Sequence, residues 1–473
     1  MNASTKHGSP VPLVMGGKNL QTENMFDVHN PKTGGFLYKR SNCDVDSGLS
    51  AVDAAASALE SWRDTTSALR RDLFLTAADL MMSPSSELAE YMIQETGAHS
   101  TWADFNVHRA RECLLDCANR VMSTEGSTPT VANSSQADLV VKEPYGVILA
   151  MAPWLVLSHR RYYRNGELIL IPLLRNAPYV LGFRSKAYAV AAGNTFVFKG
   201  SELSPRTLWA VWSIFHVSGF PSGVLNFIIC TIIEHPAIKK INFTGSAVVV
   251  RAIAQMAVAV TKPVLLELGG KAPAILCEDA GLDLAAQQCV FGAFENAGQI
   301  CMSAERILVA RAVRSGFKEK LREWTEKLFP SSRDAPTLIK GAGLIYGGLD
   351  EESKSATRSM RPIIVGDVKP NMEIYQSESF GPAVSLIEFE SEDEAVKIAN
   401  DTDYRLAASI FSRDLRRALR LARGIESGAV HINSMTVHDQ LALPHGGAKA
   451  SGYGRFGGNL DEWLRTKSIT YDC

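Results

Sequence analysis

Cys301 stands in a sequence context that favours a reactive thiol. It follows the small and polar residues of NAGQI, between a helical segment and the strand-like run ERILVA. A thiol at such a break lies on a rigid, partly exposed edge near backbone N–H donors, as nucleophilic cysteines do. Glu267, in the earlier run LLELGGKAP, could supply the carboxylate of a general base. Taken singly, Cys301 could instead be an inert core thiol, and Glu267 a helix cap or a surface charge.

A second stretch could bind a phosphate group. INFTGS predicts a strand ending at Gly245 and Ser246, and AVVVRAIAQMAVAV after it is helical. This order places backbone N–H groups and the positive end of a helix dipole where an anion can meet them. No G-x-G-x-x-G occurs, so a purely structural turn is the alternative.

Helical and strand-like segments alternate along the chain, which indicates an α/β protein. Asp46 is the predicted N-cap of a helix, and a second helix is predicted around Arg70 to Met82. The apolar face of the first helix comprises Val52, Ala55, Ala56 and Leu59. GNTFVFKGSELSP predicts a buried strand that ends in a turn.

Composition favours a soluble enzyme that acts on a small molecule. The 473 residues are 46% apolar, enough for cores in two or three domains, and 49 basic against 50 acidic residues leave a net charge of -1. Without a cationic excess, nucleic acid and anionic membranes are not expected partners. No apolar run is long enough to span a bilayer and the start lacks a secretory signal, so we expect a cytoplasmic location.

The eight cysteines are scattered, which argues against a disulfide framework and a zinc site. Cys113 and Cys117 are four residues apart on a predicted helix, with no further ligand nearby. We expect both to be packing residues and predict no metal.

The chain resembles the NAD(P)-dependent aldehyde dehydrogenase family over nearly its whole length. LELGGKAP and GQICMSAER are similar to the family's paired signature, and EPYGVILAMAPW, AAGNTFVFKGSE, INFTGS, ESFGPAVSL and GGAKASGYGR match its other landmarks in order. NAPYVLGFRS, TVHDQ and KASGYGRFGG are most similar to the salicylaldehyde and vanillin dehydrogenase type, which oxidises hydroxylated benzaldehydes.

The resemblance implies an α/β fold with a Rossmann-type cofactor domain, an α/β catalytic domain and a small β oligomerisation element. The implied ranges are residues 1–122 and 142–266 for the NAD-binding domain, 267–438 for the catalytic domain, and 123–141 with 439–473 for the oligomerisation element. A homodimer or homotetramer is the implied assembly.

For the reaction, the resemblance implies that the Cys301 thiolate attacks an aldehyde. The Cys301 N–H and the side-chain amide of Asn176 would hold the oxyanion. Hydride transfer to NAD would leave a thioester, and Glu267 would activate the water that hydrolyses it. In the substrate pocket, Arg184 would contact a ring or a phenol oxygen and Trp102 would supply an aromatic wall. Alternatively, Arg184 is only a structural ion-pair partner.

The implied cofactor is NAD rather than NADP, because Glu202 would repel a 2′-phosphate. The implied contacts are Lys199 and Glu202 with the adenosine ribose, Gly245 and Ser246 with the pyrophosphate, Glu378 and Phe380 with the nicotinamide ribose and ring, and Trp154 with the cofactor through its strand-end loop. Separately, Lys199 and Glu202 could form a surface ion pair and Phe380 could be core.

The chain departs from the family pattern in several places. Residues 155–175 form an unusual insertion between Trp154 and Asn176, and segments are missing after Cys230 and Ile339. Ala247 and Val250 stand where the family has Thr and Gly, which puts close pyrophosphate approach in doubt. The sharp edges suggest wrongly placed exon boundaries, with a genuine variant as the alternative.

The insertion predicts a weaker enzyme, because it either exposes apolar residues or displaces Asn176. Two further readings therefore remain open beside an active dehydrogenase. One is a non-redox acyl-transfer or thioesterase enzyme that uses Cys301 and Glu267. The other is an inactive homologue or misassembled gene product.

Overall fold

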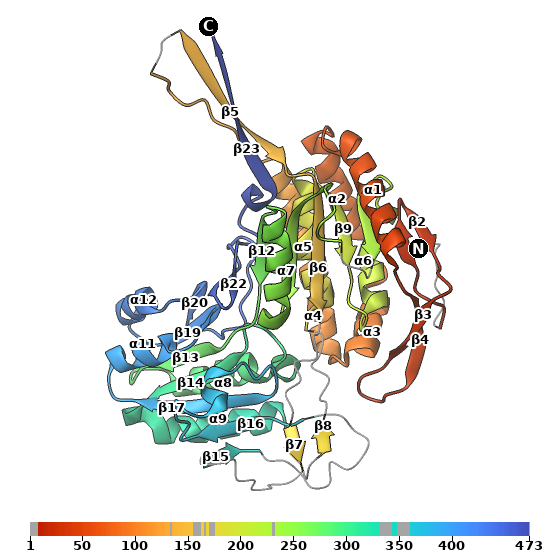
Figure 1. Ribbon diagram of the computed structural model, residues 1–473. Coiled ribbons are helices and arrows are strands. Elements are labelled where there is room, and N and C mark those ends of the chain that lie inside the picture. Colours follow the sequence, from red (N-terminus) through yellow and green to blue (C-terminus); the bar gives the residue numbers. More distant parts are fainter. Residues whose placement is uncertain are drawn as a thin grey trace.

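The computed structural model describes residues 8–132, 135–154, 162–164, 167–169, 176–228, 232–330, 343–347 and 360–472. Within these ranges two large sheets, each flanked by helices, lie one above the other in the view of Figure 1. The predicted α/β class is confirmed. The predicted domain limits stay a prediction, although the first sheet includes a strand that ends at Glu267 and the second a strand that begins at Ala272.

The first sheet has the strand order β2-β1-β10-β9-β6-β11-β12-β22. Its strands are β1 Leu13–Met15, β2 Lys18–Leu20, β6 Val147–Trp154, β9 Thr195–Lys199, β10 Leu225–Ile228, β11 Ile238–Gly245, β12 Val264–Glu267 and β22 Gly452–Tyr453. The five strands from β10 to β12 in this order run parallel, so their carboxyl ends meet at one edge. In open parallel sheets ligands bind at that edge.

Helices cover both faces of the first sheet. They are α1 Val45–Trp62, α2 Ser67–Leu80, α3 Ser85–Thr96, α4 Ser100–Val121, α5 Pro178–Ala191, α6 Pro205–Val217 and α7 Ala247–Ala259. Alternate residues of β6 separate the two cores, because Ile148 and Ala150 pack with α2 to α6, and Val147 and Leu149 pack with α1 and α7.

The prediction of Asp46 as a helix cap is wrong by two residues. α1 begins at Val45, and extended Asp44 accepts a hydrogen bond from Ser47 N at 2.8 Å. Asp46 lies inside the first turn, where it only faces the helix dipole. The predicted second helix is α2, and the buried strand predicted in GNTFVFKGSELSP is β9.

The second sheet has the strand order β15-β16-β17-β14-β13-β19-β20. Its strands are β13 Ala272–Leu276, β14 Ala304–Ala310, β15 Gly343–Tyr346, β16 Ile363–Gly366, β17 Ala383–Phe389, β19 Ala407–Phe411 and β20 Ala429–Ile432. Its helices are α8 Leu282–Phe294, α9 Arg314–Leu328, α10 Glu373–Gln376, α11 Glu392–Asn400 and α12 Leu415–Gly424, with 3-10 turns at Glu295–Gly298, Arg311–Val313 and Asp461–Trp463. The α8 and α9 pair covers one face and the α11 and α12 pair the other.

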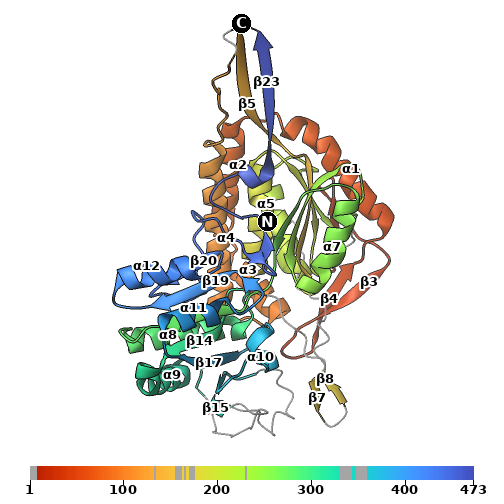
Figure 2. The same ribbon diagram turned by 60° about the vertical axis from the view of Figure 1, so that its left-hand side comes forward.

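Four two-stranded ribbons complete the described chain. They are β3 Met25–His29 with β4 Phe36–Ser41, β5 Gln136–Pro144 with β23 Leu464–Asp472, β7 Tyr162–Arg164 with β8 Glu167–Ile169, and β18 Tyr404–Arg405 with β21 Ala448–Lys449. The β5–β23 ribbon projects away from both sheets in Figures 1 and 2. The β7–β8 ribbon belongs to the predicted insertion, whose other residues lie outside the described ranges.

Cys113 and Cys117 are buried on α4, as expected for packing residues. Cys43 is disulfide-bonded, a pairing that the scattered spacing of the cysteines did not indicate. Among the described residues, no helix is long and apolar enough to cross a membrane. No cluster of His, Cys, Asp and Glu in those ranges could hold a metal ion.

Candidate active site

Cys301 and Glu267 lie side by side. Cys301 follows the 3-10 turn Glu295–Gly298 and precedes β14, and its side chain is half-buried. The turn is tight, because Asn296 and Ala297 have φ angles of 48° and 57°. Cys301 Sγ is 3.8 Å from Glu267 Oε1, within reach of a weak S–H hydrogen bond. A proton can therefore pass from this thiol to this carboxylate.

The Gly-Gly pair after Glu267 lets three segments meet. A Cβ on Gly270 would lie 2.2 Å from the carbonyl oxygen of Cys301, and one on Gly269 would lie 2.3 Å from Glu378 Oε2. Neither approach leaves room for a side chain. The glycines thus bring the chain of Cys301 and the Glu378 carboxylate against the end of β12.

Glu267 is almost completely buried, with 1% of its surface exposed. Its Oε1 is 2.7 Å from His445 Nε2, whereas its Oε2 is buried and has no hydrogen-bond partner. Burial opposes ionisation, but His445 and then Arg184 outweigh it and hold the pKa of Glu267 below its usual value. Glu267 is therefore a carboxylate at neutral pH, as a base must be.

Cys301 has the opposite tendency. Burial raises the pKa of this thiol well above its ordinary value, the nearby Glu267 and Glu378 carboxylates add to the effect, and Arg184 opposes it. In the protein without substrate Cys301 is thus a neutral thiol, and forming its thiolate needs a base within reach. Glu267 Oε1 is that base by position.

Asn176 and Trp102 meet next to the Cys301 turn. Trp102 Nε1 donates to the Asn176 carbonyl oxygen at 2.7 Å, and Asn296 Nδ2 approaches the same oxygen at 3.4 Å. Asn176 is 8% exposed, and its side-chain oxygen accepts from Ala177 N at 2.8 Å. The structure thus ties Asn176 to the turn before Cys301 despite the preceding insertion. Its role as an oxyanion donor, and that of Trp102 as a substrate wall, stay predictions.

Arg184 forms a buried ion pair with Asp439. One terminal nitrogen, Nη2, donates to both carboxylate oxygens, and the two side chains are only 4% and 11% exposed. Burial opposes ionisation of Asp439, but Arg184 lowers its pKa to about 2. Arg184 Nε is buried without a hydrogen-bond partner. The ion pair considered as an alternative is therefore present, and part of the guanidinium remains unengaged.

The turn after β11 suits a dinucleotide pyrophosphate. Gly245 pairs with Trp154 across neighbouring parallel strands, which puts both at the carboxyl edge of the first sheet. Ser246 precedes α7 without capping it, and its hydroxyl is buried without a partner. An uncapped helix start beside an unpaired hydroxyl fits a phosphate. Val250 packs into the core below. The side chain of Trp154 lies outside the described part.

Lys199 and Glu202, which are predicted to hold the adenosine ribose, form an ion pair. Lys199 Nζ lies 3.3 Å from Glu202 Oε1, and their side chains are 3% and 38% exposed. Lys199 is buried, so the pair differs from the exposed surface pair considered above. Burial lowers the pKa of Lys199 to about 8, with Arg40 adding to the effect and Glu202 opposing it. A buried ammonium beside a half-exposed carboxylate fits ribose hydroxyls, which donate and accept.

Glu378 and Phe380 are held by a buried ion pair. Glu305 accepts from Ser379 N at 2.7 Å and from Phe380 N at 3.0 Å, and its partner Lys271 Nζ is 2.6 Å away. This clamp fixes Phe380 in a left-handed conformation with φ 46°. Gly270 N donates to Glu378 Oε1 at 2.8 Å, which keeps that carboxylate close to Cys301.

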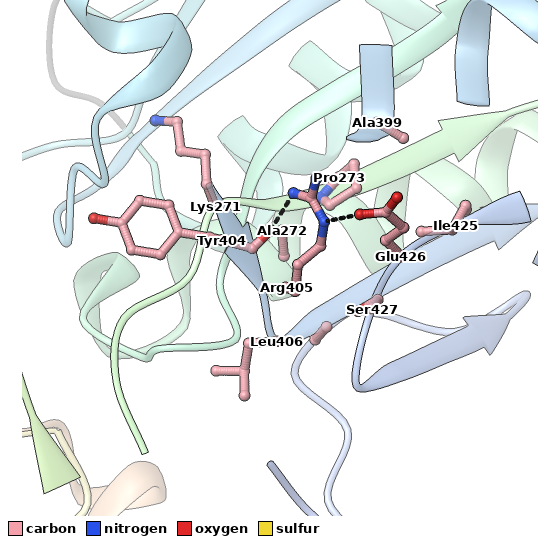
Figure 3. A pocket seen from close by; sticks show the side chains of 11 residues that line it. Lys271, Ala272, Pro273, Ala399, Tyr404, Arg405, Leu406, Ile425, Glu426 and Ser427 are labelled. Carbon is pink, nitrogen blue, oxygen red and sulfur yellow. Dashed lines mark hydrogen bonds and ion pairs between the residues drawn. The ribbon is translucent and has the colours of Figure 1, made fainter. Parts of the chain in front are cut away.

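Figure 3 shows a small pocket whose lining includes Lys271 of this clamp. Lys271 borders it on one side, and the pair of Arg405 Nε and Glu426 Oε2, 3.0 Å apart, on the other. None of the predicted catalytic side chains lines it. The pocket is therefore distinct from the predicted reaction site.

Sequence reasoning missed four charged or titratable residues of the site. His445 and Asp439 lie within or next to the quoted motifs TVHDQ and GGAKASGYGR, yet neither received a role. Lys271 and Glu305 likewise lie inside LELGGKAP and GQICMSAER. Their position inside or beside the family-like motifs was the signal that could have identified them as site residues.

Comparison with known proteins shows which family the chain matches. Residues 18–156, 175–338 and 335–469 match the model of the aldehyde dehydrogenase family. The ranges omit residues 157–174, which lie within the predicted insertion, and the last two ranges overlap at residues 335–338, close to the predicted missing segment. The origin of either feature stays open to test by sequencing the native transcript.

Individual relatives cover nearly the whole chain. It is 36% identical over 483 residues to vanillin dehydrogenase of Pseudomonas sp. (strain HR199 / DSM 7063), covering 94% of each chain. It is 30% identical over 473 residues, 93% of each chain, to succinate-semialdehyde dehydrogenase [NADP(+)] of Escherichia coli (strain K12). The fold matches the crystal structure of a salicylaldehyde dehydrogenase from Pseudomonas putida G7 complexed with salicylaldehyde, with TM-score 0.88, 32% identity and 98% of each chain covered.

Proposed function

The chain belongs to the aldehyde dehydrogenase family, and from this premise we propose that it oxidises a hydroxylated aromatic aldehyde to its carboxylic acid with NAD. The observation that carries the proposal is the Cys301 thiol 3.8 Å from a buried, ionised Glu267. The similarity to vanillin and salicylaldehyde dehydrogenases supports the aromatic class. The first test is the absorbance of reduced nicotinamide after mixing the protein with NAD and 2-hydroxybenzaldehyde.

In the proposed reaction, Glu267 takes the Cys301 proton and Sγ bonds to the aldehyde carbon. Glu267 then releases this proton to solvent, so that it is again a carboxylate for the hydrolysis step. The Cys301 N–H and the Asn176 side-chain amide hold the oxyanion, because both donors belong to segments joined at the Asn296 turn. NAD, when bound, accepts the hydride that turns the thiohemiacetal into a thioester. Water then attacks the thioester carbon, Glu267 takes its proton, and the Cys301 thiolate leaves.

We propose NAD rather than NADP, and expect Glu202→Gln to reduce this preference. The half-exposed Glu202 carboxylate repels a 2′-phosphate but accepts from ribose hydroxyls. The substitution should raise kcat/KM for NADP relative to NAD by roughly tenfold, about 1.4 kcal/mol. Steady-state rates with both cofactors measure this ratio. Glu60→Gln, an exposed change on α1, is the control. An unchanged ratio, or a wild-type protein that uses NADP equally well, would show that Glu202 faces away from the ribose.

We further expect Arg184→Leu to affect substrate choice as well as stability. It leaves Asp439 buried and unpaired, which costs about 3–5 kcal/mol of unfolding free energy. If the free Nε side of the guanidinium serves the substrate, kcat/KM for 2-hydroxybenzaldehyde falls more than that for benzaldehyde. Asp439→Asn is the matched control, because it disturbs the same ion pair from the other side. Equal losses for the two aldehydes would make Arg184 purely structural.

We also propose that the β5–β23 ribbon joins subunits in a homodimer or homotetramer. Eight of the nine residues of β23 are exposed, and a two-stranded ribbon has unpaired edges. Such a ribbon is stabilised when another chain covers it. The molar mass in solution before and after removal of residues 464–473 tests this assembly.

A further inference from the structure

His445 contacts the proposed general base directly. Its Nε2 is 2.7 Å from Glu267 Oε1, and only 10% of the imidazole side chain is exposed. Two backbone hydrogen bonds with Phe456, both 2.7 Å long, fix the chain at His445. An ionised carboxylate can only accept, so Nε2 carries the proton and donates it to Oε1. The imidazole is thus a fixed donor to one oxygen of Glu267.

The two oxygens of Glu267 have different surroundings. Oε1 faces both His445 Nε2 and Cys301 Sγ, whereas Oε2 is buried and has no hydrogen-bond partner in the structure. A buried acceptor without a partner costs free energy, so its retention calls for a reason. An oxygen reserved for a reacting water supplies one.

We propose that His445 is a positioning residue that holds Glu267 through Oε1 and leaves Oε2 free to take the proton of the hydrolytic water. This inference rests on the proposed function, because it needs an acyl group on Cys301. The water oxygen bonds to the thioester carbon, one water proton moves to Oε2, and the bond to Sγ breaks. The products are the carboxylic acid and the Cys301 thiolate.

The charges around the pair are consistent with this assignment. Those facing Glu267 are Cys301, Arg184 and Asp439, and His431 and Asp439 face His445. Burial alone would raise the pKa of Glu267, and His445 is the largest influence that lowers it. Arg184 is bound to Asp439, so it compensates only in part. Loss of His445 therefore raises the pKa of Glu267 and moves the protonation of the base toward neutral pH.

The experiment separates acylation of Cys301 from hydrolysis of the acyl group. With p-nitrophenyl acetate, the burst of nitrophenolate reports acylation and the later steady rate reports hydrolysis, without any cofactor. With aldehyde and NAD, reduced nicotinamide gives the same two phases. Each is followed against pH for the wild type, His445→Phe, His445→Gln and the control His438→Gln. His438 packs against the ring of His431, with the two ring centroids 4.7 Å apart.

His445→Phe should keep the amplitude of the burst but lower the steady rate at neutral pH at least about tenfold, because Glu267 loses the donor that holds its Oε1. The acid limb of its pH profile should move upward by about one pH unit. His445→Gln, whose amide can donate to Oε1 but cannot titrate, should return the rate to within about threefold of the wild type. His438→Gln should match the wild type in both phases.

An unchanged hydrolysis rate and acid limb in His445→Phe would overturn the inference, as would equal loss of burst and steady rate in a folded protein. A merely structural histidine would not move the acid limb. If the ester acylates the wild type but no aldehyde leads to reduction of NAD, the proposed function fails. The burst and steady rate with p-nitrophenyl acetate then still test the role of His445. Failure of acylation with both substrates contradicts both proposals.

Discussion

Cys301→Ala should abolish both aldehyde oxidation and ester hydrolysis. Both reactions need the Sγ that lies 3.8 Å from Glu267, and among the described residues no other thiol contacts that carboxylate. The expected fall in kcat is on the order of 10⁴-fold or more, as when a nucleophile is removed. Reduced nicotinamide and nitrophenolate release measure the two activities.

The control for this prediction is Cys289→Ala. Cys289 is buried on α8 in the core of the second sheet, away from Glu267. The Cys289→Ala protein should keep both activities. This result would separate the chemistry of Cys301 from a general effect of removing a buried sulfur. Normal steady-state oxidation by the Cys301→Ala protein would contradict the mechanism.

Glu267→Gln should trap the acyl-enzyme. Glutamine keeps the shape of the side chain and can still accept from His445, but it cannot take a proton from water. Hydrolysis of the thioester should slow by about 10²–10⁴-fold, the usual contribution of a general base. Because the pKa of Glu267 lies below its usual value, wild-type hydrolysis should persist to mildly acidic pH and be lost as the carboxylate is protonated.

The trapped species is measured as a mass increase on Cys301 after acid quenching. The burst of product should keep its amplitude but rise more slowly, because Cys301 must then lose its proton to solvent rather than to Glu267. Loss of the burst together with the steady rate would show that Glu267 acts mainly by deprotonating Cys301. Glu305→Gln is not a suitable control, since Glu305 holds the Phe380 segment. The exposed Glu60→Gln serves this purpose.

Sequence alone established the family and the two central residues of the site. Ordered local motifs carried the resemblance, and Cys301 and Glu267 were recognisable because each lies beside small residues at the end of a predicted element. The strand β9 and the helix α2 also followed from local apolar patterns. The exact start of α1 could not be predicted in this way. Asp44 and Asp46 are equally good caps by residue type, and only the backbone conformation distinguishes them.

Tertiary structure decided which charges meet. His445 lies 178 residues from Glu267, and Asp439 lies 255 residues from Arg184. No local pattern encodes such pairs, since they form only when β12, α5 and the segment before β22 converge at one edge of the first sheet. Burial then sets their chemistry: the same low-polarity surroundings raise the pKa of Cys301, while His445 and Arg184 keep Glu267 ionised. A residue's type determines which proton it can exchange, but its distance from opposite charges and from water determines at what pH it does so.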